Sequence, residues 1–292
     1  MKVRDMRLRR HGVVAIAVLG LMASAVVPAS AERGGGGGLD GAAKAAAFAL
    51  DVDVDVLGAL PLDVGPLARL RLSGDAGPRY VNVAKVEVPP LLEALVLATG
   101  AQTKVTKGVY SKASARVATV KLKLLGELLI KLLKSECEVS SDTVNVASDI
   151  VFADGSVLGG LVGADMLALA ARPNSRLSVP LVGDLILNEQ KIEKSSSAHG
   201  SQVTVTVNAL HLALDGILGK GDVTVAQSVC RARGKNVGKD LKIVSTTNGN
   251  DTSGQVGEGD DDGNGLHDGL LGDGGILGVN NLLGGGLLNG AL

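Results

Sequence analysis

The residues that could carry chemistry are few in this chain, and they begin with its two cysteines, Cys137 and Cys230. An even pair of cysteines in an exported protein predicts one disulfide, here closing a loop of about 93 residues. A zinc site would need histidines near the thiols, and a lone nucleophile would leave the second thiol without a role. We therefore predict a disulfide, which the chain-entropy model values at roughly 4 to 5 kcal/mol.

The histidines beyond the first 31 residues are His199, His211 and His267, and none of them lies in a recognised catalytic motif. The chain has no Gly-x-Ser-x-Gly nucleophile turn, no Gly-x-x-x-x-Gly-Lys-Ser/Thr phosphate loop and no His-Glu-x-x-His zinc motif. Glu189 is a conceivable acid, but no second carboxylate is paired with it by spacing. The sequence thus predicts a structural His211, no catalytic residue and no cofactor, with a hydrolase built around Glu189 and His211 as the alternative.

One acidic segment resembles the start of a calcium-binding loop, with oxygen ligands at Asp260, Asp262 and Asn264. The twelfth position of that loop is Leu271, where the motif requires a bidentate glutamate, and no helix is expected before it. We predict a solvated acidic linker at this place, with calcium binding as the alternative.

The start of the chain has the three parts of an export signal. Basic residues from Lys2 to Arg10 precede an apolar, uncharged run of 16 residues from Gly12 to Val27, and Ala29-Ser-Ala31 fits a cleavage site before Glu32. A membrane anchor is the alternative, but a span needs roughly 20 residues. Residues 1–31 are therefore predicted to be a signal peptide, and the mature chain to be secreted or held at the cell surface, without a transmembrane segment.

The composition behind the predicted cleavage site changes twice. Residues 32–44, with five consecutive glycines, predict a flexible linker. Residues 45–230 alternate apolar with polar side chains and predict a β-rich extracellular domain. Residues 231–292 are basic, then acidic, then rich in Gly, Leu and Asn, and they predict a disordered tail.

The longest strict alternation runs from Val203 to Leu214 and predicts a central strand of layered β structure. Its valines form one apolar face and its leucines the opposite face, so the apolar face switches at Asn208-Ala209. Either a bulge inserts one residue there, or the two ends of the strand are covered on opposite faces.

A second alternation places Asp51, Asp53 and Asp55 on one face and apolar side chains on the other. This pattern is typical of a half-buried antiparallel strand with a solvated outer face. A calcium-binding ladder is the alternative function of the three aspartates.

These runs and others like them predict a mainly β fold, either an antiparallel β-sandwich or another layered β domain. Two short helices are predicted near 91–99 and 124–133. The leucines from Leu124 to Leu133 recur at helical spacing, although Gly126 and the strand-like neighbours fit a strand equally well. The serine-rich segment from Lys191 to Ser201 predicts an exposed loop.

The composition excludes two classes of partner. Two Phe, two Tyr and no Trp leave no aromatic platform on which sugars or single-stranded nucleic acid could stack. Lys and Arg number 29 against 30 Asp and Glu, so no global basic field attracts nucleic acid.

Several short stretches together resemble the choice-of-anchor P family of actinobacterial exported proteins. These stretches are Pro173-Asn-Ser175, Leu187-Asn-Glu-Gln190, Val207-Asn-Ala-Leu-His-Leu212, Asp222-Val-Thr-Val225 and Ala115-Arg-Val-Ala-Thr-Val120. The resemblance covers about residues 40–230 and implies an extracellular β-rich domain of undetermined activity whose members end in different surface anchors. No recognised anchor ends this chain.

The sequence therefore predicts a secreted or envelope-associated structural or interaction domain without catalytic activity, with an unidentified envelope or protein partner. A surface component that self-assembles through its Gly/Leu/Asn tail is an alternative, as is the hydrolase named above.

Overall fold

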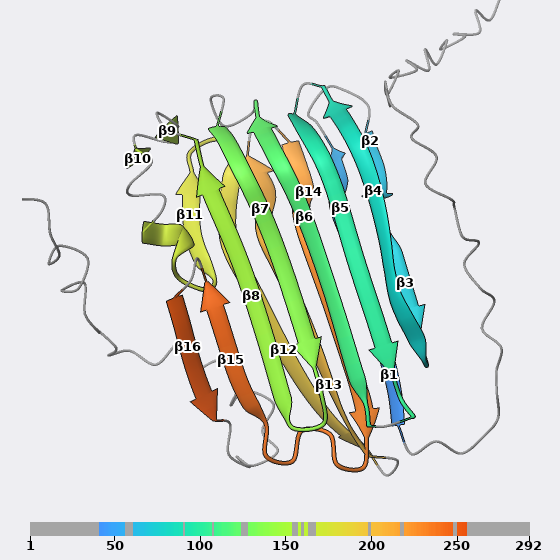
Figure 1. Cartoon of the computed structure of the whole chain (residues 1–292). Coiled ribbons are helices and arrows are strands. Elements are labelled where there is room, and N and C mark those ends of the chain that lie inside the picture. Colours follow the sequence, from blue (N-terminus) through green and yellow to red (C-terminus); the bar gives the residue numbers. More distant parts are fainter. Residues whose placement is uncertain are drawn as a thin grey trace, which may run out of the picture.

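The computed structural model shows a sandwich of two β-sheets (Figure 1). The structure describes residues 41–55, 61–89, 91–106, 108–123, 128–153, 157–158, 161–162, 168–197, 200–216, 219–247 and 250–255. Helix is confined, within these residues, to one turn at 168–170, and none of the described helical structure is long and apolar enough to cross a membrane.

Sheet A has seven strands, six of them in the order β11-β12-β13-β14-β1-β2. The seventh, β3, pairs with the first half of β1, and β2 pairs with the second half. The strands are β1 (Gly41–Asp55), β2 (Pro61–Leu67), β3 (Leu70–Ser73), β11 (Ser175–Val179), β12 (Gly183–Ser197), β13 (Gly200–Gly216) and β14 (Gly219–Gly234). All of its pairs are antiparallel. The central strand predicted from sequence is β13, which confirms that expectation.

Sheet B has the order β16-β15-β8-β7-β6-β5-β4. Its strands are β4 (Ala76–Val88), β5 (Leu92–Lys104), β6 (Tyr110–Leu122), β7 (Leu128–Val139), β8 (Thr143–Phe152), β15 (Lys242–Thr247) and β16 (Asn250–Gln255). The pairing of β15 with β8 is parallel, and the other pairs are antiparallel. A separate small hairpin joins β9 (Val157–Leu158) to β10 (Leu161–Val162). The mainly β, layered fold is therefore confirmed.

A transverse row of extra residues, which we call the crease, crosses the long strands of both sheets. On each of these strands the core-facing pattern skips two residues in place of one: after Ala47 on β1, Val207 on β13 and Val225 on β14 in sheet A, for example. Adjacent strands gain the extra residue at the same level, so the ladder between them keeps its register. Where a neighbour lacks it, as β8 does beside β7, the register shifts.

The crease settles how the central strand is covered. The valines of β13 before the crease and the leucines after it are all buried in the same core between the sheets, with 5% exposure or less. The two ends of the strand are therefore not covered on opposite faces. Three residues at the crease have positive φ in a strand: Val96 at 49°, Asn188 at 52° and Ala226 at 55°. A bulge inserts one extra residue into one strand of a pair. Here the neighbouring strands each carry one extra residue at the same level.

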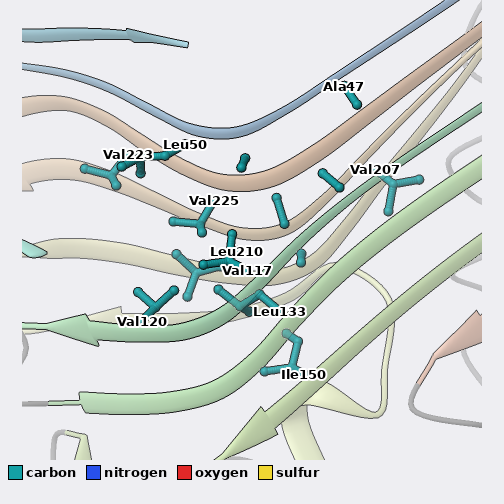
Figure 2. Close-up of a cluster of buried hydrophobic side chains, with 14 of the residues drawn as sticks. Ala47, Leu50, Val117, Val120, Leu133, Ile150, Val207, Leu210, Val223 and Val225 are labelled. Carbon is teal, nitrogen blue, oxygen red and sulfur yellow. The ribbon is translucent and has the colours of Figure 1, made fainter. Parts of the chain in front are cut away.

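The core differs on the two sides of the crease. On one side large aliphatic side chains such as Leu50, Val120 and Val223 fill the space between the sheets (Figure 2). On the other side many core-facing residues of β1, β6 and β14 are small, among them Ala45, Ala113 and Ser228, while β13 contributes its valines. Small side chains let two sheets approach closely, so the packing on this side combines alanine and serine with the valines of β13.

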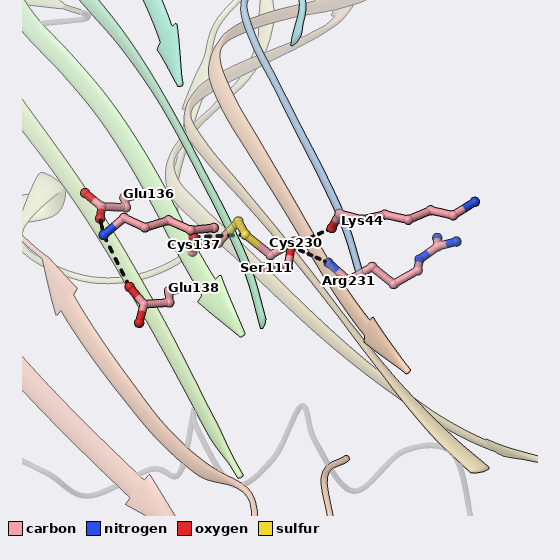
Figure 3. Close-up of a disulfide and its surroundings, with 8 residues drawn as sticks. Lys44, Ser111, Glu136, Cys137, Glu138, Cys230 and Arg231 are labelled. Atoms are coloured by element: carbon pink, nitrogen blue, oxygen red, sulfur yellow. Dashed lines mark hydrogen bonds and ion pairs between the residues drawn. A yellow bond between two sulfur atoms is a disulfide. The ribbon is translucent and has the colours of Figure 1, made fainter. Parts of the chain in front are cut away.

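The predicted disulfide is confirmed and lies on the side with the small residues (Figure 3). It joins Cys137 of β7 to Cys230 of β14 across the two sheets, with 5.9 Å between their Cα atoms. Beside it the Ser111 hydroxyl donates to the Lys44 carbonyl at 2.5 Å and accepts from the Arg231 N–H at 3.3 Å. A side chain as short as serine thus reaches the backbone of the opposite sheet, which locks the sheets at this level. A metal pair or a free nucleophile is excluded for these cysteines.

Both predicted helices are wrong. The 91–99 segment lies largely in β5, and the described part of 124–133 lies in β7. Both errors have the same cause. The crease adds one residue to each of these strands, and this interrupts the period-two alternation that identifies a strand. In β7 the core-facing residues are Leu128, Ile130 and Leu133, a spacing that mixes two and three and imitates a helix. Leu129 and Leu132 face the other way, half-buried on the outer side of sheet B.

The predicted domain limits also need correction. Strand β1 begins at Gly41, inside the segment predicted to be a linker. Strand β14 continues to Gly234, and β15 and β16 complete sheet B within the segment predicted to be disordered. The described part of the predicted loop from Lys191 to Ser201 is instead strand: residues 191–197 form the far half of β12 and residues 200–201 begin β13, with which β12 pairs through its backbone. Polar sequence there reflects the exposed outer face and the sheet end, where backbone hydrogen bonds need no apolar side chains.

Candidate functional site

The outer face of sheet A, which we call the sheet A face, collects the polar residues that the sequence singled out. Stretches that carry the family resemblance meet there at the crease. Asn174 accepts from the Gln190 N–H at 2.7 Å through its side-chain oxygen, and its own N–H donates to the Asn188 carbonyl at 2.9 Å. The Asn188 side chain donates in turn to the Ala170 carbonyl. These bonds tie the kinked part of β12 to the segment that precedes β11.

His211 lies next to this point and is held between two carboxylates. Its Nδ1 lies 2.9 Å from Glu189 Oε2 on β12, and its Nε2 lies 2.8 Å from Asp222 Oδ1 on β14. Asn208 donates to the same Glu189 oxygen at 2.6 Å, and Gln227 donates to Asn208 at 2.8 Å. We call these five residues the His211 clasp. They connect three adjacent strands across the sheet A face.

The clasp keeps a proton on His211. The hydrogen bond that His211 donates to Glu189, and then the one that it donates to Asp222, raise the pKa of His211 to about 9 against the opposing effect of burial. The same bond to His211 is the main cause that lowers the pKa of Glu189. At neutral pH both ring nitrogens therefore donate, so neither has a free lone pair with which to take a proton from a nucleophile. The chemistry that this arrangement supports is an ion pair that joins strands.

The predicted acidic face of β1 continues onto the neighbouring strands. Asp53 is directly opposite Asp63 of β2 on one side and Asp222 of β14 on the other, and all three side chains are exposed. We call this line of aspartates the acidic row. Like charges directly opposite each other in a sheet are destabilising. The pKa of nearby Asp51 is raised, first by burial and then by the charges of Asp63 and Asp53.

A line of cations crosses the same face on the other side of the crease. Lys44 of β1 is directly opposite Arg231 of β14, and Arg71 of β3 is opposite Ala46, one outward position further along β1. All three cationic side chains are exposed. We call Lys44, Arg71 and Arg231 the basic row. Figure 3 shows Lys44 and Arg231 extending side by side, away from the disulfide.

The structure places several predicted site residues and leaves others undescribed. Among the described residues, no group of three or more His, Cys, Asp or Glu is arranged to hold a metal ion. The signal and its cleavage site at Ala31 and Glu32 lie outside the described residues, as do the other histidines and the calcium candidates Asp260, Asp262 and Asn264.

Sequence reasoning missed three of the five clasp residues: Asn208, Asp222 and Gln227. One signal could have found Asp222, because the β13–β14 hairpin register places it diagonally from His211, which is opposite Thr224. Cross-strand diagonals lie within reach of long side chains. Asn208 lies opposite both Glu189 and Gln227, and its role could be found only with the register of β12 against β13 as well.

A pocket of about 270 Å³ lies elsewhere, at the end of the sandwich beyond the disulfide. Gly41, Val109, Gly234 and Val237 are among the residues that line it.

No protein family, characterised protein or solved structure matches the chain in the comparisons with known proteins.

Proposed function

We propose that the chain is an exported β-sandwich that acts as a structural or binding domain at or outside the cell envelope, and that it does so without catalysing a reaction. The observation that carries this proposal is the sheet A face, on which charge is sorted into an acidic and a basic row. Charge sorted over a broad face suits recognition of another macromolecule, because complementary fields steer and orient the encounter.

The state of His211 supports the non-catalytic part. A general base near neutral pH needs a free lone pair and a pKa close to the working pH. His211 has both nitrogens engaged by carboxylates and a pKa of about 9. The clasp therefore favours a structural role over the hydrolase alternative.

Export is supported by the signal-like residues 1–31 and by the Cys137–Cys230 disulfide, since disulfides persist in oxidising compartments. The resemblance to the choice-of-anchor P family points the same way and stays a prediction.

Fractionation of the producing cells, followed by mass spectrometry of the chain, tests the proposal. We expect the chain in the medium or envelope fraction, beginning at Glu32, with a peptide that links Cys137 to Cys230. A chain found in the cytoplasm with residues 1–31 attached and both thiols reduced would refute export.

To test the catalytic alternative, His211→Gln is compared with the native chain against a panel of ester, amide and glycoside substrates. Turnover by the native chain that His211→Gln abolishes would refute the non-catalytic proposal.

A further inference from the structure

We propose that the sheet A face binds a second copy of this chain, turned so that the acidic row of each copy lies over the basic row of the other. The inference rests on the proposed function, whose binding surface it uses, and it names the partner.

The first observation is the charge left unbalanced within one copy. Lys44 and Arg231 are direct neighbours across two strands, and so are Asp53 and Asp63. None of the ion pairs between described residues includes any of these four. The Lys44–Arg231 and Asp53–Asp63 pairs therefore keep like-charge repulsion that an oppositely charged surface would relieve, whereas Asp222 already has His211 as a partner.

The second observation is the symmetry of the spacing. Lys44 lies four residues before Phe48 on β1, and Asp53 lies five residues after it. At about 3.3 Å per residue the two rows are roughly 30 Å apart, with Phe48 close to the midpoint. A two-fold axis parallel to the sheet, across the strands at Phe48, would therefore bring Lys44 of one copy over Asp53 of the other.

The same rotation matches the neighbouring strand. Because the axis runs across the strands, β14 of one copy faces β14 of the other, and Arg231 comes over Asp222. An axis parallel to the strands would instead place the acidic row of one copy over the acidic row of the other, and the basic row over the basic row, so that like charges would repel. The charge pattern thus selects one orientation, and the resulting contact is isologous, as in most two-fold dimers.

The middle of the face suits a contact between copies. Phe48 is half-buried on it, opposite Gln227, and Ala46 is half-buried opposite Val229. A stretch of about 30 Å over four strands spaced about 4.8 Å apart gives a footprint of roughly 600 Å². Standard interfaces bury about 800 Å² on each partner, so we expect a weak, salt-sensitive dimer.

Sedimentation velocity of the full folded chain tests the proposal with two charge-reversed variants. Lys44→Glu with Arg71→Glu makes the face acidic at both ends, and Asp53→Lys with Asp63→Lys makes it basic at both ends. We expect the native chain to dimerise at roughly 10 mM ionic strength, where screening is weak. The dimer should dissociate at roughly 0.5 M salt, where the charges are screened. Each variant alone should dimerise at least tenfold more weakly, and an equimolar mixture should form a heterodimer.

The heterodimer separates lost recognition from lost folding, since misfolded chains would not associate when mixed. The single variants Lys44→Glu and Asp53→Lys provide the same comparison with smaller changes. Arg116→Glu on the outer face of sheet B is the matched control and should dimerise as the native chain does. A monomeric native chain at low salt, variants that dimerise unchanged, or a mixture that stays monomeric would each overturn the proposal. The broader proposed function would survive that result if the sheet A face proved covered by another partner in the envelope.

Discussion

At the scale of single residues, the His211 clasp links the protonation of one side chain to the pairing of three strands. Glu189 and Asp222 come from the strands on either side of β13, so the charged imidazole bridges both neighbours. The side chain of His211 is 20% exposed and that of Asp222 is 62% exposed. The Glu189 contact should therefore contribute more than the Asp222 contact, because solvent screens the latter.

The clasp predicts how stability depends on pH. The pKa of His211 is higher in the folded chain, at about 9, than its ordinary value of 6.5, so the folded state holds the proton more tightly. The stabilisation is fully present below about pH 6.5 and is lost as pH rises through about 9. The full shift corresponds to at most roughly 3 kcal/mol, and with solvent screening we expect a loss of about 1 to 2 kcal/mol.

Urea unfolding at a series of pH values measures this dependence, and an NMR titration of the His211 ring measures its pKa. In His211→Gln the fall between pH 6.5 and 9 should shrink to the background set by other groups. A His211 pKa at or below 6.5 in the folded chain would contradict the clasp.

The buried hydroxyls near the disulfide give a second prediction at this scale. Ser228 is fully buried and its Oγ has no hydrogen-bond partner among the described residues, whereas Ser148 Oγ donates to the Lys134 carbonyl at 3.2 Å. Removing an unsatisfied hydroxyl removes a desolvation cost of about 1 kcal/mol. We expect Ser228→Ala to be neutral or stabilising by up to that amount and Ser148→Ala to be destabilising, as measured by chemical unfolding. The reverse order would contradict the assignment.

At the scale of elements, the crease explains both what sequence patterns reveal and where they fail. Alternation predicts β8 well because that strand lacks the added residue, and β13 because each of its halves follows period two. The added residue is invisible locally on β5 and β7, where it turned strand patterns into apparent helices. Pairing across the sheet decides the outcome, and pairing is not encoded in local periodicity.

The same limit applies to the candidate site. Glu189 and His211 could be picked out as ionisable residues near the predicted central strand, but 22 positions separate them. Their contact follows from the register of β12 against β13 and from the kink at Asn188. The charge rows likewise depend on β1 lying between β14 and the early strands β2 and β3, a crossover that connects the two ends of the described chain.

Backbone conformation at the crease predicts the effect of a substitution on β5. Val96 has φ of 49° and is 56% exposed, although β-branched residues strongly disfavour positive φ. Asparagine tolerates this region better, so Val96→Asn should stabilise the fold by about 0.5 to 1 kcal/mol. Thermal unfolding measures the change. The matched control is Ala98→Asn, two residues further on in the regular ladder with Asn82, which should not stabilise. A loss of stability in Val96→Asn would contradict the strain.

At the scale of the whole molecule, aliphatic packing joins the two sheets on both sides of the crease, and a covalent bond adds to it on the side with the smaller residues. Many core-facing residues near Cys137 and Cys230 are small and bury less apolar area than leucines do, so the disulfide adds a share of the stability there. The double variant Cys137→Ala with Cys230→Ala should lose about 2 to 4 kcal/mol of unfolding free energy. Denaturant unfolding with and without reductant measures this loss. The native chain should be sensitive to reductant and the variant insensitive, and equal stability of the two would contradict the role given to the bond.

The central claim is that the sheet A face is covered by a partner where the protein works. Carbodiimide labelling of carboxylates, read out by mass spectrometry, tests it most directly when the chain in its native fraction is compared with the dilute, purified chain in high salt. We expect Asp53 and Asp63 to be labelled several-fold less in the native fraction, while Glu87 and Glu138 on sheet B are labelled equally in both. Equal labelling of Asp53 and Asp63 in the two samples would contradict the claim.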